Sequence, residues 1–286
     1  MVRTIITALL LLVATTVDAS GLAWRVTAPD GAHLYLVGTV HAARPDFYPL
    51  PIRITDAFEA ADALTMEVNT TLIDPGAAAR FGREHGTLSG GRTLEELLGN
   101  EDWRRASEWG RKLGIPQRRL SMMRPWLAAV SLVSLEIRRI GLDSALGMEM
   151  HFAARAVERG MPIVELETLV EQLSALSNLS PEAEVAFLKQ SLTTADEFAA
   201  SVNDIVDSWL AGDADAMKRV LEDSYEGADE VYDAVMRARN QRWLPAIERM
   251  IESEEVHFVA VGALHMVGED GLVRLLEARG YNVERL

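Results

Sequence analysis

Apolar residues recur along the chain in two patterns, as short continuous runs and as longer stretches with helical spacing. The short runs are rich in β-branched residues and are bounded by turn-forming residues, which is typical of strands. The first two runs flank Pro29-Asp30-Gly31 and therefore predict a hairpin. The five best strand predictions are 24–27, 33–37, 64–68, 163–167 and 256–261.

Helical spacing of apolar residues dominates two long stretches, at about 70–160 and 169–254. Pro125 suits the first position of a helix, and a second helix is predicted from about Ser144 to Arg159, ending at Gly160. Ser180-Pro181 predicts an N-cap followed by a first helical residue.

Because these stretches separate the strands, we expect an α/β fold with a central mixed, largely parallel sheet. The helical insertions would form a helical lobe. After the strand at 256–261, a helix at 268–279 and a last strand at 281–284 predict a βαβ ending.

The composition is that of a folded protein, with 286 residues of which 49% are hydrophobic. We predict a single domain over 20–286, since no low-complexity linker divides the chain. The formal net charge of -15 argues against binding to nucleic acid, whose phosphates need cationic partners.

The N-terminus has the features of a secretory signal peptide. Arg3 precedes an apolar run at 5–17, and Val17-Asp18-Ala19 offers small residues at a cleavage site. Residues 1–19 are therefore predicted to direct export to the periplasm or the cell exterior, and no later stretch is long and apolar enough to span a membrane. The chain has no cysteine, so any metal would be held by His, Asp and Glu.

Two Gly-x-x-His turns carry the first candidate chemistry. Each follows an apolar run, the first placing His41 after the strand at 33–37 and the second placing His265 after the strand at 256–261. Glu67 lies at the end of the strand at 64–68. The strand at 163–167 ends with two acidic residues, Glu165 and Glu167.

The carboxyl ends of parallel strands gather at one edge of a sheet, where ligands bind, so these side chains are predicted to converge. Taken singly, a loop histidine or a glutamate at a strand end is usually a solvated side chain. Together, His41, Glu67 and His265 could hold zinc, manganese, iron or cobalt. Without a metal, a glutamate would serve as general base and a histidine as general acid.

A cation on an apolar helical stripe adds to this set. Arg239 lies in the middle of such a stripe and Asn240 borders it, so the guanidinium needs a buried partner. Either it forms a structural ion pair, or it positions a carboxylate or stabilises an oxyanion, which we favour. His33 and His257, at the opposite ends of their strands, are expected to be exposed to solvent.

These residues resemble a known group of proteins, the TraB/PrgY/GumN family, which includes the Tiki proteases. The resemblance rests on short motifs spread over nearly the whole mature chain, and the GumN-like bacterial branch fits best. The motifs are Tyr35-Leu36-Val37-Gly38-Thr39-Val40-His41, Glu67, Arg124-Pro125-Trp126, Leu166-Glu167-Thr168 with Gln172, Arg239-Asn240 before Trp243, and Val261-Gly262-Ala263-Leu264-His265 with Gly268 and Gly271.

The resemblance implies the fold of erythromycin esterase and the haem-binding ChaN proteins. It also implies a metal-dependent protease in which His41, His265 and Glu67 form the metal site, with Arg239 and Asn240 matching a further motif. Gly147-Met148-Glu149 departs from a Gly-x-Asp pattern common in the family, which puts the role of Glu149 in doubt.

Three hypotheses follow. The first is an exported hydrolase, a metal-dependent peptidase acting on a peptide or amide, with Glu167 orienting a ligand or water and Arg239 and Asn240 binding the oxyanion. The second is a non-catalytic protein that sequesters a peptide or haem in the same cleft. The third is a structural envelope protein with a degenerate site.

Overall fold

The computed structural model describes residues 21–286 except 75 and 193–194. The predicted signal peptide, 1–19, lies outside the described residues. The described chain forms a six-stranded mixed sheet with the order β4-β3-β5-β2-β1-β6. The strands are β1 (Leu22–Thr27), β2 (His33–Thr39), β3 (Ala63–Met66), β4 (Ile163–Glu165), β5 (His257–Gly262) and β6 (Asn282–Arg285).

The predicted α/β class with a largely parallel sheet is confirmed. Strands β4, β3, β5 and β2 pair in parallel with one another in that order, whereas β1 pairs antiparallel with β2 and with β6. The predicted hairpin is β1–β2, where Gly31 takes a φ of 96° and Asp30 accepts a hydrogen bond from the N–H of Ala32. Every residue of β3 and β5 is buried, as their continuous apolar runs require.

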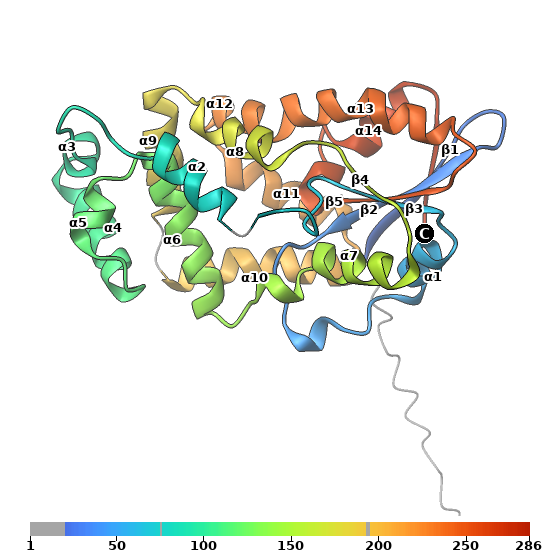
Figure 1. Cartoon of the computed structure of the whole chain (residues 1–286), viewed down its shortest axis with the longest axis horizontal. Coiled ribbons are helices and arrows are strands. Elements are labelled where there is room, and N and C mark those ends of the chain that lie inside the picture. The colour runs from blue at the N-terminus through green and yellow to red at the C-terminus, as the bar shows by residue number, and fades with distance from the viewer. Residues whose placement is uncertain (1–20, 75, 193–194) are drawn as a thin grey trace, which may run out of the picture.

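The helices occupy both faces of the sheet and extend beyond one end of it (Figure 1). They are α1 (Ile52–Glu59), α2 (Ala77–His85), α3 (Leu94–Leu98), α4 (Asn100–Lys112), α5 (Gln117–Ser121), α6 (Pro125–Arg139), α7 (Met148–Arg159), α8 (Leu169–Ser177), α9 (Pro181–Ser191), α10 (Ala195–Ala211), α11 (Ala214–Tyr225), α12 (Asp229–Tyr232), α13 (Ala238–Ile251) and α14 (Leu272–Ala278). None of the described helices combines the length and the apolar character needed to cross a membrane.

The helices between β3 and β4, and between β4 and β5, are the predicted helical insertions. In Figure 1, α13 and α14 lie on one side of the sheet and α1 and α7 on the other, while α3 to α5 lie far from the strands. One apolar core surrounds the sheet, and a second core lies within the lobe around Leu94, Trp103 and Leu132. The lobe therefore has packing of its own.

Several local predictions need correction. The helix expected from Ser144 begins at Met148, because residues 144–146 form a 3-10 turn capped by Asp143. His257 is buried, not exposed, and its Nδ1 lies 2.9 Å from the hydroxyl of Thr65. The last strand, β6, pairs with β1 instead of β5, so the final crossover passes over two strands.

Candidate functional site

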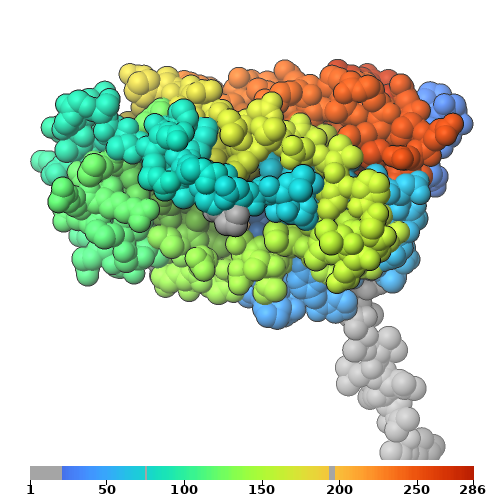
Figure 2. All heavy atoms as spheres, in the orientation of Figure 1, coloured from blue at the N-terminus to red at the C-terminus, as the bar shows by residue number. Residues whose placement is uncertain are grey.

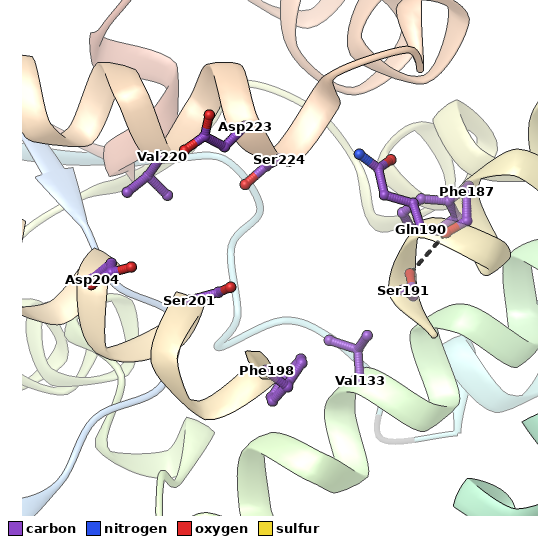
Figure 3. Close-up of a pocket in the computed structure, with 10 residues that line it drawn as sticks. All are labelled: Val133, Phe187, Gln190, Ser191, Phe198, Ser201, Asp204, Val220, Asp223 and Ser224. Atoms are coloured by element: carbon purple, nitrogen blue, oxygen red, sulfur yellow. Dashed lines mark hydrogen bonds between the residues drawn. The ribbon is translucent and has the colours of Figure 1, made fainter. Parts of the chain in front are cut away.

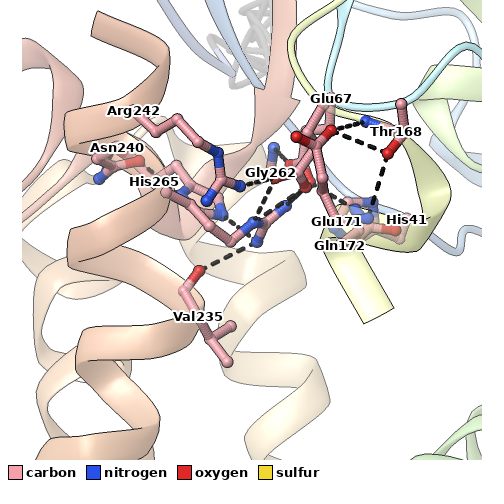
Figure 4. A network of polar contacts seen from close by, with 12 residues as sticks. His41, Glu67, Thr168, Glu171, Gln172, Val235, Asn240, Arg242, Gly262 and His265 are labelled. Carbon is pink, nitrogen blue, oxygen red and sulfur yellow. Dashed lines mark hydrogen bonds and ion pairs between the residues drawn. The ribbon is translucent and has the colours of Figure 1, made fainter. Parts of the chain in front are cut away.

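The predicted convergence at the carboxyl edge of the sheet is present in the structure. His41 follows β2, Glu67 directly follows β3, and His265 lies in a 3-10 turn, Ala263–Met266, after β5. Figure 4 shows these side chains within one network of polar contacts, with Asn240 and His265 beside one another and Gln172 near Glu67. Glu67, Glu167 and His265 are buried.

Two glycines allow the Gly-x-x-His turns to meet. A Cβ placed on Gly38 would lie 3.0 Å from the Cα of Ala263. The two turns can therefore pack closely because Gly38 has no side chain. A Cβ placed on Gly262 would lie 3.1 Å from Nε2 of His41 and 3.2 Å from Oε1 of Glu67. The bare Cα of Gly262 thus leaves a small gap that both catalytic candidates face.

Replacing Gly262 with alanine should fill that gap. Gly262 has a φ of -50°, which alanine adopts without strain, so we expect the fold to persist. The new methyl would displace the His41 ring or the Glu67 carboxylate by a few tenths of an ångström, so any reaction that depends on this pair should slow by up to about 100-fold. Turnover and circular dichroism of the variant test this, and unchanged turnover would show that the gap is not used.

Arg239 is the centre of the buried network. Its side chain is 6% exposed, and NH2 donates to Oε2 of Glu67 at 2.5 Å and to Oε1 of Glu167 at 2.5 Å. Nε also donates to Glu167, while NH1 donates to the carbonyl of Val235 and to Nε2 of His265, both at 3.0 Å. A guanidinium has five N–H donors, and these contacts use all five.

Local backbone geometry aims Arg239 into the site. The stripe expected to run through this helix changes phase at a π-helical turn, Asp233–Arg237, immediately before α13. The helix continues through Pro245, which does not break it. Trp243 packs beneath, with the guanidinium carbon 4.6 Å from the centroid of its ring. π-turns of this kind are frequent at functional sites.

The contacts of His265 fix its protonation state. Arg239 can only donate, so Nε2 of His265 accepts and carries no proton. Nδ1 therefore carries the proton and donates to Oδ1 of Asn240 at 2.7 Å. Asn240 in turn donates to the carbonyl of Asp270 at 2.7 Å. Burial, with Arg239 nearby, lowers the pKa of His265 to about 3, which keeps the imidazole neutral.

These contacts decide whether the residues fit the metal that the sequence suggested. A metal bound by His41, Glu67 and His265 needs a free lone pair on each ligand. Both nitrogens of His265 are engaged by Arg239 and Asn240. No group of three His, Asp or Glu among the described residues has an arrangement that could hold a metal ion. In this arrangement the cation between Glu67 and His265 is the guanidinium of Arg239.

His41 has a different partner, Glu149. Nδ1 of His41 lies 2.8 Å from Oε1 of Glu149, a carboxylate that also accepts from the hydroxyl of Thr39. The side chain of His41 is 69% exposed, and the neighbouring charge of Glu149 raises its pKa to about 9. The imidazole is therefore protonated at neutral pH, and its Nε2–H faces the gap beside Gly262.

The role of Glu149 was in doubt from the sequence alone, and an acidic residue in the first turn of a helix also has an ordinary explanation. The useful signal was the preceding glycine. A Cβ on Gly147 would lie 2.4 Å from the carbonyl oxygen of His41, so only glycine permits α7 to begin against that backbone. The N–H of Met148 donates to the carbonyl of Val40, which fixes the approach and brings Glu149 to His41.

Glu67 is ionised in this setting. Burial acts to raise its pKa, but the positive charges of Arg239 and His41, together with the backbone N–H of Gly262, outweigh burial and lower that pKa to about 2. Oε2 accepts from Arg239 and from the side-chain amide of Gln172 at 3.1 Å. Oε1 accepts from the backbone N–H of Gly262 at 2.7 Å. Oε1 is the oxygen on the side of His41.

A cavity of about 640 Å³ opens above this group. His41, Glu67, Glu149, Gln172 and Arg239 supply its charged and polar part. The remaining walls are largely apolar and include Val68, Ile73, Val130, Leu173, Leu176 and Val235. Figure 2 shows the face on which the teal segment around α2 lies above the green helices of the lobe. This size and lining are typical of a small-molecule or peptide site.

Comparison with known proteins shows the family to which the chain belongs. The sequence profile of the TraB/PrgY/gumN family matches residues 22–285, almost the whole described chain. The chain belongs to this family. The resemblance inferred from the motifs is thereby confirmed.

Two relatives are similar along most of their length. The protein named Uncharacterized protein YbaP of Escherichia coli (strain K12) is 27% identical over 251 residues, which is 88% of this chain and 90% of the relative. The protein of the same name from Shigella flexneri has the same identity and coverage. These similarities place the chain in the TraB/PrgY/gumN family without assigning a reaction.

Proposed function

We propose that this member of the TraB/PrgY/gumN family is a hydrolase that cleaves a peptide or amide bond. The observation that supports the proposal is the pair formed by His41 and Glu67. A protonated imidazole and an ionised carboxylate face the same gap beside Gly262, at the polar end of an apolar cavity. An acid and a base on either side of one small space are what amide hydrolysis requires.

The proposed chemistry divides the proton transfers between these two residues. Oε1 of Glu67 takes a proton from water as the water oxygen attacks the carbonyl carbon. Nε2 of His41 gives its proton to the leaving nitrogen as the carbon–nitrogen bond breaks. His41 then regains a proton by way of Glu67 and solvent, and the enzyme returns to its starting state.

The remaining residues position this pair. Arg239 holds Glu67 ionised and supplies the positive charge that the sequence assigned to zinc, manganese, iron or cobalt. Because its five N–H groups are used within the protein, we assign Arg239 to positioning Glu67 in place of binding an oxyanion. Glu167 holds Arg239, and Asn240 fixes the tautomer of His265.

The walls of the cavity favour a substrate with apolar side chains near the scissile bond. We propose that the protein meets this substrate outside the cytoplasm, since residues 1–19 have the pattern of a signal peptide.

The test is hydrolysis of a library of peptides with apolar residues by the purified mature protein. Turnover should require His41, so His41→Ala should abolish it. Turnover should persist after dialysis against a chelator, with no stoichiometric metal by elemental analysis. Loss of turnover on chelation, restored by one divalent metal, would reject the role of Arg239 while leaving the hydrolase proposal standing.

A second candidate function is sequestration without catalysis. It is favoured by the apolar walls and by the complete use of the donors of Arg239, which leaves none directed at an oxyanion. A peptide recovered intact after long incubation, or a haem absorption band that His41→Ala removes, would support this candidate over the hydrolase.

The pH dependence of turnover provides a sharper prediction. His41 acts as the acid only while protonated, so turnover should hold through neutral pH and fall above pH 9, where the raised pKa lies. Glu149→Gln removes the charge that raises this pKa, so the alkaline fall should move toward the ordinary value of 6.5. Glu158→Gln, on the exposed part of the same helix, should leave the profile unchanged. A profile that ignores Glu149→Gln would exclude His41 as the acid.

A further inference from the structure

A second cavity, of about 670 Å³, lies in the helical lobe between α2, α5 and α6. Its apolar floor includes Met123 and Leu127, and Met122 beside them is 51% exposed. Ala78, Ala79 and Gly82 form the side that α2 provides, where small residues leave room above Leu127. An apolar surface of this size is large enough for a medium-sized ligand.

The charge of this cavity is opposite to that of the whole molecule. Arg83 from α2 and Arg118 and Arg119 from α5 line it, and none of its lining residues is acidic. Within the described part of the chain, these three arginines have no ion-pair partner. The full chain has 43 acidic residues against 28 Lys and Arg, so the positive charge of this cavity contrasts with the negative charge of the chain as a whole.

Another hollow in the lobe has the opposite charge. The hollow between α6, α9, α10 and α11 has about 370 Å³ and is drawn in Figure 3. Asp204 and Asp223 are its only charged lining residues among those described, and its hydroxyl groups come from serines. An anion would be repelled there and attracted to the arginine cavity.

We propose that the arginine cavity binds an amphiphilic anion, a molecule with one anionic head and an unbranched apolar tail. The head would pair with Arg118, Arg119 and Arg83, whose planar guanidinium groups match a carboxylate or sulfate. The tail would lie over Met122, Met123 and Leu127. Apolar contact and charge are each weak at an exposed site, and their combination in one cavity selects a ligand that has both.

The net charge of the protein limits what can occupy the arginine cavity. The net charge of -15 repels an anionic membrane surface as a whole, so a single dissolved molecule is the occupant to which we commit. Helix α6 borders both cavities, with Leu127 and Ser131 in the arginine cavity and Val130 in the catalytic one. The inference goes beyond the proposed function and holds whether or not the protein is a hydrolase.

The experiment is calorimetric titration of the mature protein with dodecanoate at low ionic strength, below the micellar range. Dodecyltrimethylammonium, which has the same tail and a cationic head, is the matched probe. We expect dodecanoate to bind at one site. The affinity for dodecyltrimethylammonium should be lower by about tenfold or more, because only the anion forms charge-assisted contacts.

Variants locate the site. Arg118→Glu with Arg119→Glu should weaken dodecanoate binding about tenfold or more. Arg53→Glu with Arg249→Glu makes the same change in formal charge at exposed positions outside the cavity and should leave binding unchanged. The neutral pair Arg118→Gln and Arg119→Gln serves if the reversed pair fails to fold, and should also weaken binding.

Three outcomes would overturn the proposal. Equal binding of both probes would show that only the tail matters. Equal losses in the two charge-reversed pairs would show a general effect of net charge. Undiminished binding to the variants at Arg118 and Arg119 would place the ligand elsewhere, and its loss in His41→Ala would then locate it in the catalytic cavity.

Discussion

Replacing Arg239 with methionine should lower the free energy of unfolding by about 3–5 kcal/mol, the cost of leaving buried carboxylates without their cation. Glu67 loses the guanidinium that pairs with it at 2.5 Å, and Glu167, whose side chain has no exposed surface, keeps only the half-exposed Arg242 as a cationic partner. Methionine keeps much of the apolar stem of arginine, so packing against Trp243 is largely retained. The loss should therefore be electrostatic.

Chemical denaturation of the two proteins measures the difference, and Arg242→Met is the matched control. Arg242 pairs with the same carboxylate, Glu167, at 2.5 Å, but its side chain is 45% exposed. Exposed ion pairs contribute at most about 1 kcal/mol, so the control should change little. Equal effects of the two substitutions would mean that the network around Arg239 does not depend on burial.

Arg239→Lys separates charge from geometry. Lysine keeps the positive charge but has three donors on one nitrogen, so it cannot reach Glu67, Glu167, Val235 and His265 together. We expect stability between that of the wild type and that of the methionine variant. A lysine variant as stable as the wild type would show that a point charge suffices.

The convergence of the site was predictable from the sequence because it follows from topology. Parallel strands end at one edge, so polar residues placed just after β2, β3 and β5 had to meet once the strands were recognised. The runs before His41 and His265 were largely apolar and carried a glycine three residues before the histidine, and the run before Glu67 was apolar except for Thr65, which made recognition straightforward. Glu167, two residues past β4, followed from the same reasoning.

Pairing within the site was not predictable in the same way. The sequence indicated that Arg239 needed a buried partner, but not that one guanidinium would bridge Glu67, Glu167 and His265. That arrangement depends on the π-turn before α13, which shifts the helical phase and is not visible in apolar spacing. The position of the Arg239 guanidinium between Glu67 and His265 could therefore be found only from the positions of individual donor atoms.

The contact of Glu149 could not be predicted from the sequence for a second reason. Its contact with His41 joins residues 108 positions apart in different elements, and the short sequence around it fits an ordinary helix start. His257 was misjudged because position along a strand says nothing about what covers that end of the sheet. Its neighbour Thr65 comes from β3, which pairs with β5.

Glu67→Gln should lower turnover about 100- to 10,000-fold, the range that general base catalysis contributes. The amide has nearly the shape of the carboxylate and can still accept from Gly262, but it cannot take a proton from water. Substrate binding should change little, because the walls that hold the substrate are apolar. The loss should therefore appear in kcat and leave KM nearly constant.

The shorter acid in Glu67→Asp distinguishes chemistry from packing. Aspartate keeps the base but withdraws it from the gap beside Gly262 by about one methylene, so turnover should be low yet measurably above that of the glutamine variant. The Glu67→Gln variant should also remain folded, because Arg239 still pairs with Glu167. A loss of turnover in this variant would therefore not come from unfolding. Full turnover in a folded Glu67→Gln protein would show that Glu67 has only a structural role. The general base would then have to be Glu149, the other carboxylate lining the cavity.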